Sequence, residues 1–226
     1  MVAREVRRHH ADEWPHVSPS GDDYASFYKA FSEHFRSTPD DVKQRLSVHA
    51  RFLAASGGPP GPVVDLGVGR GEWLELAAQA GWKVIGVDSN ADIVSAARRP
   101  GVEIVRADAM EYLEGIAPGT VGAVTGFHII EHLRAQDKLR FFRGAFQALA
   151  PGGFLILEWP NIGHARVAQY TYWLDPTHDA PFPADLAVFM AGFVGFADIK
   201  LRRLDAGVPV GFEALDIALT ARKPPA

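Results

Sequence analysis

Residues 63–73 read VVDLGVGRGEW, and the rest of the chain can be interpreted outward from them. A short apolar strand runs into a glycine-rich turn, and the turn opens into a helix. Glycines let a ligand approach the backbone, and a helix N-terminus favours a carboxylate or a phosphate. The spacing Gly-x-Gly-x-Gly differs from the Gly-x-Gly-x-x-Gly of dinucleotide-binding turns, and no P-loop Lys follows. The stretch therefore predicts a ligand-binding turn of another kind.

Acidic side chains stand at the ends of three predicted strands around this turn. Asp65 precedes the glycines, Asp88 ends the second strand, and Asp108 follows the third. A carboxylate at the second strand tip can accept both ribose hydroxyls of an adenosine ligand. Asp108 can accept from an adenine amino group while the next backbone N–H, that of Ala109, meets a ring nitrogen. Each Asp alone is more often a helix cap or a turn residue, but three around one turn predict an adenosine-containing ligand.

Short apolar strands alternate with helices along most of the chain. We expect strands at 63–66, 83–87, 103–107, 121–127, 153–159, 196–203 and 212–221. We expect helices at 22–36, 40–56, 71–80, 91–98, 135–149 and 184–191, the first with an aromatic stripe that includes Phe27, Tyr28, Phe31 and Phe35. This alternation predicts an α/β fold, a parallel sheet with helices on both faces, closed by an antiparallel hairpin.

Composition limits the classes of protein to consider. The 226 residues include no Cys, which excludes disulfide scaffolds, Cys-ligated metal sites and a Cys nucleophile. A net charge of −4 counts against binding nucleic acid through a basic face. No apolar run reaches the roughly 18 residues of a membrane span, and the charged N-terminus lacks a signal-peptide core. We therefore expect a cytoplasmic protein with no membrane span.

Composition shifts also suggest how the chain is divided. Residues 57–62 read GGPPGP and mark a boundary. We expect an irregular segment at 1–21, a helical cover at 22–56 and a ligand-binding domain at 57–226. Within that domain, residues 160–182 form an irregular insertion after the fifth strand.

Taken together, the motifs DLGVGRG at 65–71, VD at 87–88, DA at 108–109 and EHL at 131–133 resemble those of class I S-adenosylmethionine-dependent methyltransferases. The resemblance covers about residues 60–222. It implies a Rossmann-like sheet of seven strands, the last antiparallel, and S-adenosylmethionine as cofactor. It also implies cofactor contacts from Asp65, Gly67, Gly69, Gly71, Asp88, Ser89, Asp108, Ala109 and Phe127.

Residues 127–133 read FHIIEHL and follow the fourth predicted strand. The His-x-x-Glu-His pattern also occurs in zinc proteases, but a strand-to-helix switch within a cofactor-binding sheet does not suit that site. In one interpretation Glu131 and His132 brace the next helix. In the other, His128, Glu131 and His132 bind a divalent cation, with Mg²⁺ as the abundant candidate. For the second interpretation, the residue pattern at 128–132 resembles that of the plant small-RNA 2′-O-methyltransferases. His128 departs from that pattern, because the family has Glu at this position.

The insertion after the fifth strand is rich in aromatic residues and follows the carboxylate Glu158. Its rings can stack on sugar faces or form an apolar lid. We expect substrate contacts from Tyr170, Tyr172, Trp173 and Asp175. The run LDPTH at 174–178 and the N-terminal helices resemble bacterial polysaccharide methyltransferases, among them those of the mycobacterial methylmannose polysaccharides. That resemblance implies that Arg36 pairs with the cofactor carboxylate.

These observations predict methyl transfer from S-adenosylmethionine to a saccharide hydroxyl. An alcohol needs a base or a metal, because its own pKa is high. We assign catalytic roles to His132, His178 and Glu158. The alternatives are an RNA 2′-O-methyltransferase, a quinone or natural-product O-methyltransferase, and a non-catalytic binding module. We expect a saccharide acceptor as partner and no binding of nucleic acid. A homodimer is an open alternative to a monomer.

Overall fold

The structure is a computed structural model that describes residues 27, 28, 31, 34, 35, 37–57, 61–204 and 215–225. The chain divides into two compact units, residues 1–41 and residues 42–226. In the first unit, the five described residues between 27 and 35 are helical. The ring of Phe31 lies 6.2, 6.0 and 4.8 Å from those of Phe27, Tyr28 and Phe35, so the described part of the predicted aromatic stripe is present.

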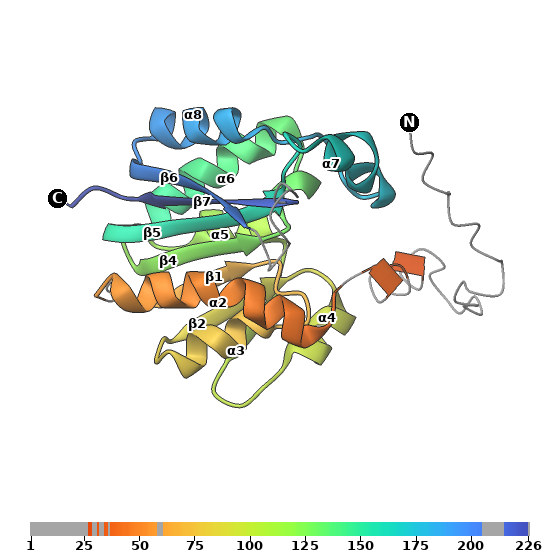
Figure 1. Ribbon diagram of the computed structural model, residues 1–226. Helices are drawn as coiled ribbons and strands as arrows, with labels where there is room; N and C mark the ends of the chain where they lie inside the picture. The colour runs from red at the N-terminus through yellow and green to blue at the C-terminus, as the bar shows by residue number, and fades with distance from the viewer. Residues whose placement is uncertain are drawn as a thin grey trace, which may run out of the picture. The chain divides into compact units, whose positions relative to one another are not determined.

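The second unit is built on one seven-stranded sheet (Figure 1). Its strands are β1 (Val63–Leu66), β2 (Val84–Asp88), β3 (Glu103–Arg106), β4 (Val121–Phe127), β5 (Leu149–Pro160), β6 (Ala197–Leu204) and β7 (Asp216–Arg222). The strand order is β3-β2-β1-β4-β5-β7-β6, and β7 is antiparallel to both of its neighbours. The other pairs are parallel. The expected seven-stranded sheet with an antiparallel last strand is confirmed.

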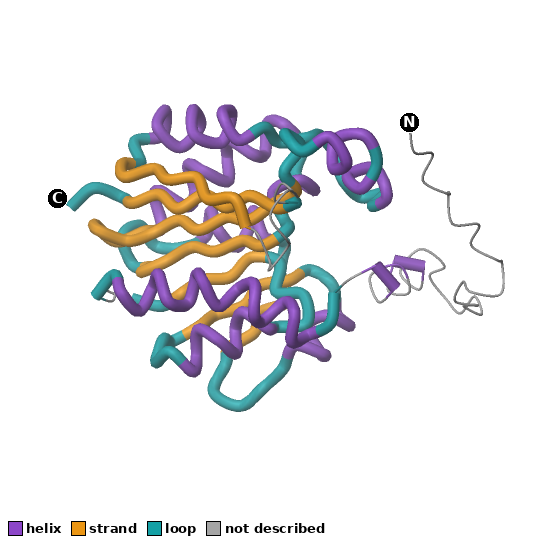
Figure 2. Tube along the Cα trace, viewed as in Figure 1, coloured by secondary structure: helices purple, strands orange, loops and turns teal. Residues whose placement is uncertain are grey.

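Helices cover both faces of the sheet (Figures 1 and 2). They are α2 (Pro39–Ala55), α3 (Glu72–Gln79), α4 (Ala91–Ala97), α5 (Ala109–Gly115), α6 (Ala135–Ala148), α7 (Ala165–Gln169) and α8 (Ala184–Val194), with 3₁₀ turns η2 (Ile130–His132) and η3 (Thr171–Leu174). One core cluster packs α2 and α3 on the sheet. A second packs α5, α6 and α8 on the opposite face. Among the described helices, none is both long and apolar enough to cross a membrane.

Two expectations about local structure were wrong. No helix was expected at Ala109–Gly115, yet α5 lies there and buries Met110 and Leu113. The insertion at 160–182 is not wholly irregular, because it contains α7 and η3. All three elements have seven residues or fewer, too few for a hydrophobic period to be recognised.

The helix α2 is an integral part of the second unit from Val42 onward. Val42, Leu46 and Leu53 are buried in the core cluster of the sheet. Lys43 forms an ion pair with Glu75 of α3 at 2.9 Å. This helix therefore shares one core with the sheet and contributes side chains to the site described next.

Candidate active site

The glycine loop lies at the carboxyl end of β1. Gly67, Gly69 and Gly71 have φ angles of 77°, 52° and 82°, a region that glycine adopts without strain. Arg99 donates from its guanidinium to the carbonyl oxygens of Gly71 and Arg70, at 2.7 and 3.0 Å. A Cβ atom at Gly71 would lie 1.7 Å from this guanidinium. Arg99, which no sequence signal identified, therefore holds the loop, and the positive φ of Gly71 favours glycine at its last position.

Asp65 is buried beneath the loop, with 1% of its surface exposed. Thr125 donates its hydroxyl to Oδ1 of Asp65 at 2.7 Å, and Trp73 donates its indole N–H to the same hydroxyl at 3.0 Å. Burial raises the pKa of Asp65 well above its usual value, against the lowering effect of Thr125. Asp65 thus supports the loop from below, and its predicted cofactor contact stays a prediction.

The other two predicted acids stand at neighbouring strand tips. Asp88 ends β2 and accepts from the backbone N–H of Asn90 at 2.9 Å, with Ser89 beside it. Asp108 follows β3 and caps α5, because its Oδ1 accepts from the N–H groups of Met110 and Glu111. One carboxylate oxygen of Asp108 remains without a hydrogen bond among the described residues. Ala109 opens α5, and a first-turn N–H of a helix has no partner within the helix.

Two further predicted cofactor residues have different outcomes. Phe127 ends β4, and its ring packs 5.0 Å from Trp73 and 5.3 Å from His49. It therefore joins the sheet to α2 and α3 at the margin of the glycine loop. Arg36 lies outside the described residues.

A buried ion cluster lies at the ends of β4, β5 and β7. Glu158 of β5 is fully buried, 2.9 Å from Nε of Arg45 and 3.1 Å from Nε2 of His49. Nε2 of His128 lies 3.4 Å from the same carboxylate, and Asp216 of β7 lies 3.3 Å from Arg45. Burial raises the pKa of Glu158, but His128, His49 and Arg45 outweigh it and hold that pKa well below its usual range.

His128 connects this cluster to Glu131. Its φ of 58° is unusual for a residue with a side chain and costs on the order of 1 kcal/mol. Nδ1 of His128 lies 3.1 Å from Oε1 of Glu131, while Nε2 faces Glu158 and Asp216. Burial disfavours the imidazolium, but these carboxylates outweigh it and raise the pKa of His128 to about 10. His128 is therefore charged at neutral pH and holds one oxygen of Glu131.

The second oxygen of Glu131, Oε2, is buried and has no hydrogen-bond partner among the described residues. Glu131 also forms a group with His132 and His178, in which one potential ligand atom from each residue lies within 4.8 Å of the other two. The two imidazole rings lie 4.8 Å apart. The lowered pKa of Glu131 reflects His128 and His132, which together outweigh burial. Glu131 thus places its carboxylate close to two histidines.

Both histidines are oriented through their Nδ1 atoms. Nδ1 of His178 donates to the carbonyl oxygen of Tyr172 at 2.6 Å, since a carbonyl only accepts. Thr177 donates its hydroxyl to Asp175, so that hydroxyl accepts from Nδ1 of His132 at 2.8 Å. In the neutral rings, Nε2 then carries the lone pair. Burial lowers the pKa of His178, which keeps that ring neutral.

The predicted metal trio does not converge as expected. His128 groups with Glu158 and Asp216, whereas Glu131 and His132 group with His178. The first group also contacts Arg45, whose charge opposes a cation there. The second has two imidazoles and one carboxylate, a donor set that suits transition metals, whereas Mg²⁺ prefers oxygen ligands.

The predicted substrate residues lie on η3 and its flanks, beside the two histidines. Tyr170 and Trp173 are each 60% exposed. Trp173 donates its indole N–H to the carbonyl of Ala168, which holds the ring in place. Tyr172 is buried, its ring 4.5 Å from that of His178, and Asp175 orients Thr177. The exposed Trp173 thus connects to His178 through the buried ring of Tyr172.

Several residues of this site have no motif in the sequence. Arg45, His49, Thr125 and Asp216 come from α2, β4 and β7, and each acts through a partner distant in sequence. The helical spacing of apolar residues can predict that His49 is buried, but it does not predict which residue His49 contacts. Only the folded chain shows that Arg45 and Asp216, 171 residues apart, meet at 3.3 Å.

Comparisons with known proteins agree with the fold. A family model described as a methyltransferase domain matches residues 34–191. A crystal structure of a SAM-dependent methyltransferase from Archaeoglobus fulgidus aligns with a TM-score of 0.75 and 25% identity, covering 87% of this chain and 100% of that one. A methyltransferase structure from Mesorhizobium loti aligns with a TM-score of 0.59 and 19% identity, covering 76% and 96%.

Curated relatives match over shorter stretches. A ubiquinone biosynthesis O-methyltransferase of Xanthomonas campestris is 32% identical over 120 residues, 50% of this chain and 49% of the relative. A probable S-adenosylmethionine-dependent methyltransferase of Mycobacterium tuberculosis is 29% identical over 141 residues, 62% of this chain and 50% of the relative. The chain spans about half the length of the curated relatives it matches.

Proposed function

Because the chain belongs to the methyltransferase-domain family, we propose that it transfers the methyl group of S-adenosylmethionine to a hydroxyl oxygen of a small organic acceptor. The class I methyltransferase fold expected from the sequence is confirmed. The narrower polysaccharide group stays a prediction. Oxygen as the methylated atom is favoured by the name of the Xanthomonas relatives.

The described residues fit the cofactor. The glycine loop leaves backbone free of Cβ atoms, and Asp88 and Asp108 stand at the next two strand tips. In this proposal Asp88 accepts from the ribose hydroxyls, and the unused oxygen of Asp108 accepts from the adenine amino group. The backbone N–H of Ala109 donates to an adenine ring nitrogen. The bound cofactor supplies an electrophilic methyl group on a sulfonium.

His132 is our candidate general base, and its available Nε2 is the observation that carries the proposal. Nε2 takes the hydroxyl proton as the acceptor oxygen attacks the methyl carbon. The new C–O bond forms as the C–S bond breaks, and S-adenosylhomocysteine leaves. The carboxylate of Glu131 has an oxygen within 4.8 Å of a ring nitrogen of His132, close enough to stabilise the imidazolium. We favour His132 over His178 because the His178 side chain is only 9% exposed.

The same three side chains fit a divalent cation, which would lower the pKa of a bound hydroxyl in place of a base. Glu131, His132 and His178 would hold it. The donor set favours Mn²⁺, Fe²⁺ or Zn²⁺ over the expected Mg²⁺. Removing metal separates the two chemistries. If His132 is the base, EDTA leaves turnover unchanged; if a cation is required, EDTA abolishes turnover and one of these ions restores it.

Variants of the two histidines test the assignment. We expect His132→Gln to lower kcat by about 10²- to 10⁴-fold, the usual contribution of a general base. We expect His178→Gln to lower it less. His164→Asn is the matched control, since His164 only caps α7 and Asn also caps helices. Calorimetry with S-adenosylmethionine should give equal affinity for all three. Full activity of His132→Gln would overturn the assignment.

Two acceptor classes remain for a direct screen with labelled S-adenosylmethionine. Quinone-type acceptors with a ring hydroxyl are suggested by the name of the Xanthomonas relatives, ubiquinone biosynthesis O-methyltransferase. Saccharides are favoured by the exposed rings of Tyr170 and Trp173, since aromatic rings pack against sugar faces. If the acceptor is a saccharide, Trp173→Ala should raise KM more than it changes kcat. No methyl transfer to either class would argue against the proposed small acceptor.

A further inference from the structure

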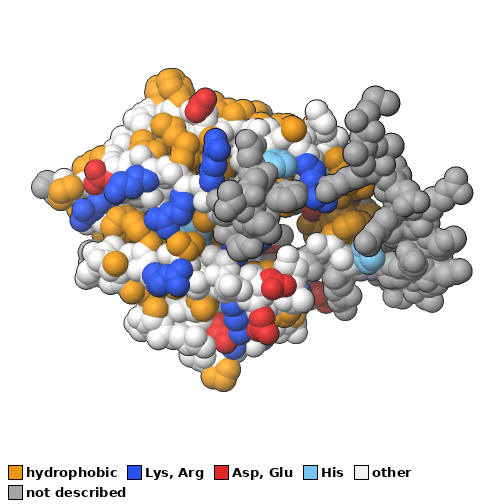
Figure 3. Space-filling model, viewed as in Figure 1, with side chains coloured by type: hydrophobic (Ala, Val, Ile, Leu, Met, Phe, Trp, Pro, Cys, Tyr) orange, Lys and Arg blue, Asp and Glu red, His pale blue; other side chains and the backbone are white. Residues whose placement is uncertain are grey.

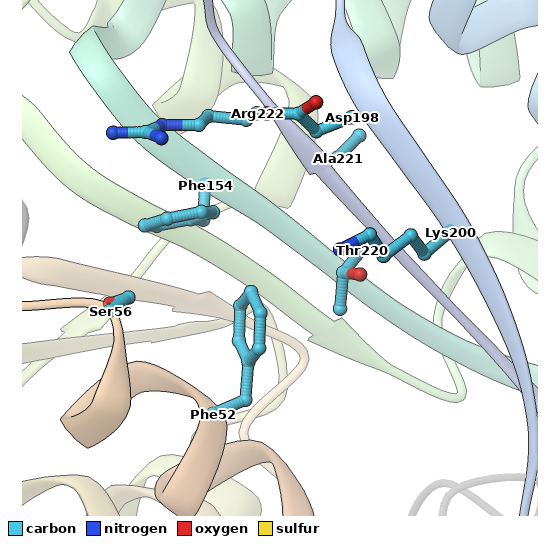
Figure 4. Close-up of a pocket in the computed structure, with 8 residues that line it drawn as sticks. All are labelled: Phe52, Ser56, Phe154, Asp198, Lys200, Thr220, Ala221 and Arg222. Atoms are coloured by element: carbon cyan, nitrogen blue, oxygen red, sulfur yellow. The ribbon is translucent and has the colours of Figure 1, made fainter.

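A pocket lies away from the glycine loop, with a cavity volume of about 220 Å³. Phe52 of α2 and Phe154 of β5 form one side, and Lys200 of β6 with Thr220 and Arg222 of β7 form the other (Figure 4). Phe154 and Glu158 lie four positions apart on β5, a distance of roughly 13 Å along an extended strand. The pocket is therefore distinct from the proposed methyl-transfer site.

Positive charge dominates the polar lining. Lys200 makes no hydrogen bond or ion pair within the described part of the chain, and its side chain points toward Thr220 and the space beside Phe52 (Figure 4). Arg222 lies over the ring of Phe154, 5.4 Å from its centroid, and among the described residues it donates only its Nε, to the carbonyl of Gly152. Asp198 is the single acid among the described residues that line the pocket. Figure 3 shows Lys and Arg side chains over this part of the surface.

The apolar side is preformed. The rings of Phe52 and Phe154 meet edge to face, with centroids 5.2 Å apart. Phe154 is only 8% exposed and belongs to the core, so its position does not depend on a ligand. Such a corner offers a flat ring one face and one edge to pack against.

The strand β6 is distorted where it lines the pocket. Its register with β7 shifts between Ala197 and Lys200, and Asp198 has a φ of 49°. A β-bulge of this kind re-aims side chains locally. Asp198 and Lys200, two positions apart on this strand, both line the pocket.

We propose that this pocket binds an organic anion in which a carboxylate or phosphate is attached to an aromatic ring. The anionic group lies between Lys200 and Arg222, and the ring packs against Phe52 and Phe154. The ammonium of Lys200 favours an anionic group, and the corner formed by Phe52 and Phe154 favours an aromatic ring on the same ligand. Inorganic anions lack the ring, and neutral aromatics lack the charge.

The test uses the full chain, labelled with ¹⁵N and titrated with phenyl phosphate, benzoate, inorganic phosphate and benzyl alcohol. We expect saturable shifts of the amide signals around Lys200 and Arg222 with the first two probes. Inorganic phosphate and benzyl alcohol should bind several-fold more weakly. Binding of inorganic phosphate as tight as that of phenyl phosphate would overturn the proposal, as would the absence of saturable binding.

Charge variants of opposite sign sharpen this test. Lys200→Gln should weaken phenyl phosphate binding by roughly two- to five-fold, the usual range for an exposed charge pair. Asp198→Asn should strengthen binding by a similar factor, and Asn tolerates the positive φ. Arg202→Gln is the matched control, an exposed charge on the same strand outside the pocket. If Arg202→Gln weakens binding as much as Lys200→Gln, the effect is one of general surface charge and the proposal fails.

Discussion

Glu158 illustrates how one buried charge organises this site. Its carboxylate is inaccessible to solvent and lies within 3.4 Å of Arg45, His49 and His128. A general base must reach the acceptor, whereas each close neighbour of Glu158 belongs to the protein. The geometry therefore favours a positioning role, in which Glu158 joins α2 to β4 and orients His128. The catalytic role expected from the sequence stays an untested prediction.

Glu158→Gln tests this role of the carboxylate. The amide keeps the shape but removes the negative charge, which leaves Arg45 and His128 with less compensation. We expect the free energy of unfolding to fall by about 3 kcal/mol, in line with breaking a buried ion pair. Urea denaturation measures it, with Asp216→Asn as the control, because the Asp216 side chain is 18% exposed and should cost less. Unchanged stability together with lost turnover would restore the catalytic interpretation.

His128 predicts how stability depends on pH. Its pKa is raised to about 10 in the folded chain, above an unfolded value of about 6.5. The stabilisation is therefore complete below about pH 6.5 and is lost as pH rises toward 10. Because the ring is 32% exposed, we expect a loss of about 2 kcal/mol over this window. Urea denaturation at several pH values should show this slope in the natural chain and a flatter curve for His128→Gln.

Asp108 has two roles at the start of α5 that one pair of variants separates. Asn is also a good helix cap, so Asp108→Asn should leave the free energy of unfolding within a few tenths of a kcal/mol of the natural value. It should weaken S-adenosylmethionine binding roughly tenfold, because a charge-assisted hydrogen bond becomes a neutral one. Asp108→Ala should lose about 1 kcal/mol of stability as well. Calorimetry and thermal unfolding measure the two effects, and equal binding by all three forms would remove Asp108 from the cofactor site.

Elements with a long period or a fixed motif could be predicted from the sequence. The apolar strand β1, the three glycines and the acids at 88 and 108 carry local signals, so the sheet and loop followed from them. The helix α5 carried no such signal, because seven residues bury only Met110 and Leu113. The grouping of Glu131 with His178 arises only when the insertion folds back, where Asp179 donates its N–H to the carbonyl of Glu131. Contacts of this range depend on tertiary packing and leave no pattern in the chain.

At the scale of the whole chain, the stability of residues 42–226 depends on side chains near their N-terminal end. They form one compact unit that includes most of α2. Val42, Leu46 and Leu53 are each at most 3% exposed. Three such side chains contribute about 6 kcal/mol at typical burial energies, a large share of the usual 5–15 kcal/mol. The helix also brings Arg45 and His49 to Glu158, so its loss would leave a buried carboxylate with His128 alone.

Two truncations follow from this balance. A chain that begins at Ser37 keeps α2 and should unfold cooperatively, with a melting temperature close to that of the full protein. A chain that begins at Gly57 lacks α2 and should be unfolded or molten, with weak near-ultraviolet circular dichroism. The first truncation also removes Arg36, so a loss of S-adenosylmethionine affinity with an unchanged melting temperature would support its expected pairing with the cofactor carboxylate. A stable, cooperative fold in the second would mean that α2 is an appendage and that Glu158 tolerates burial without Arg45 and His49.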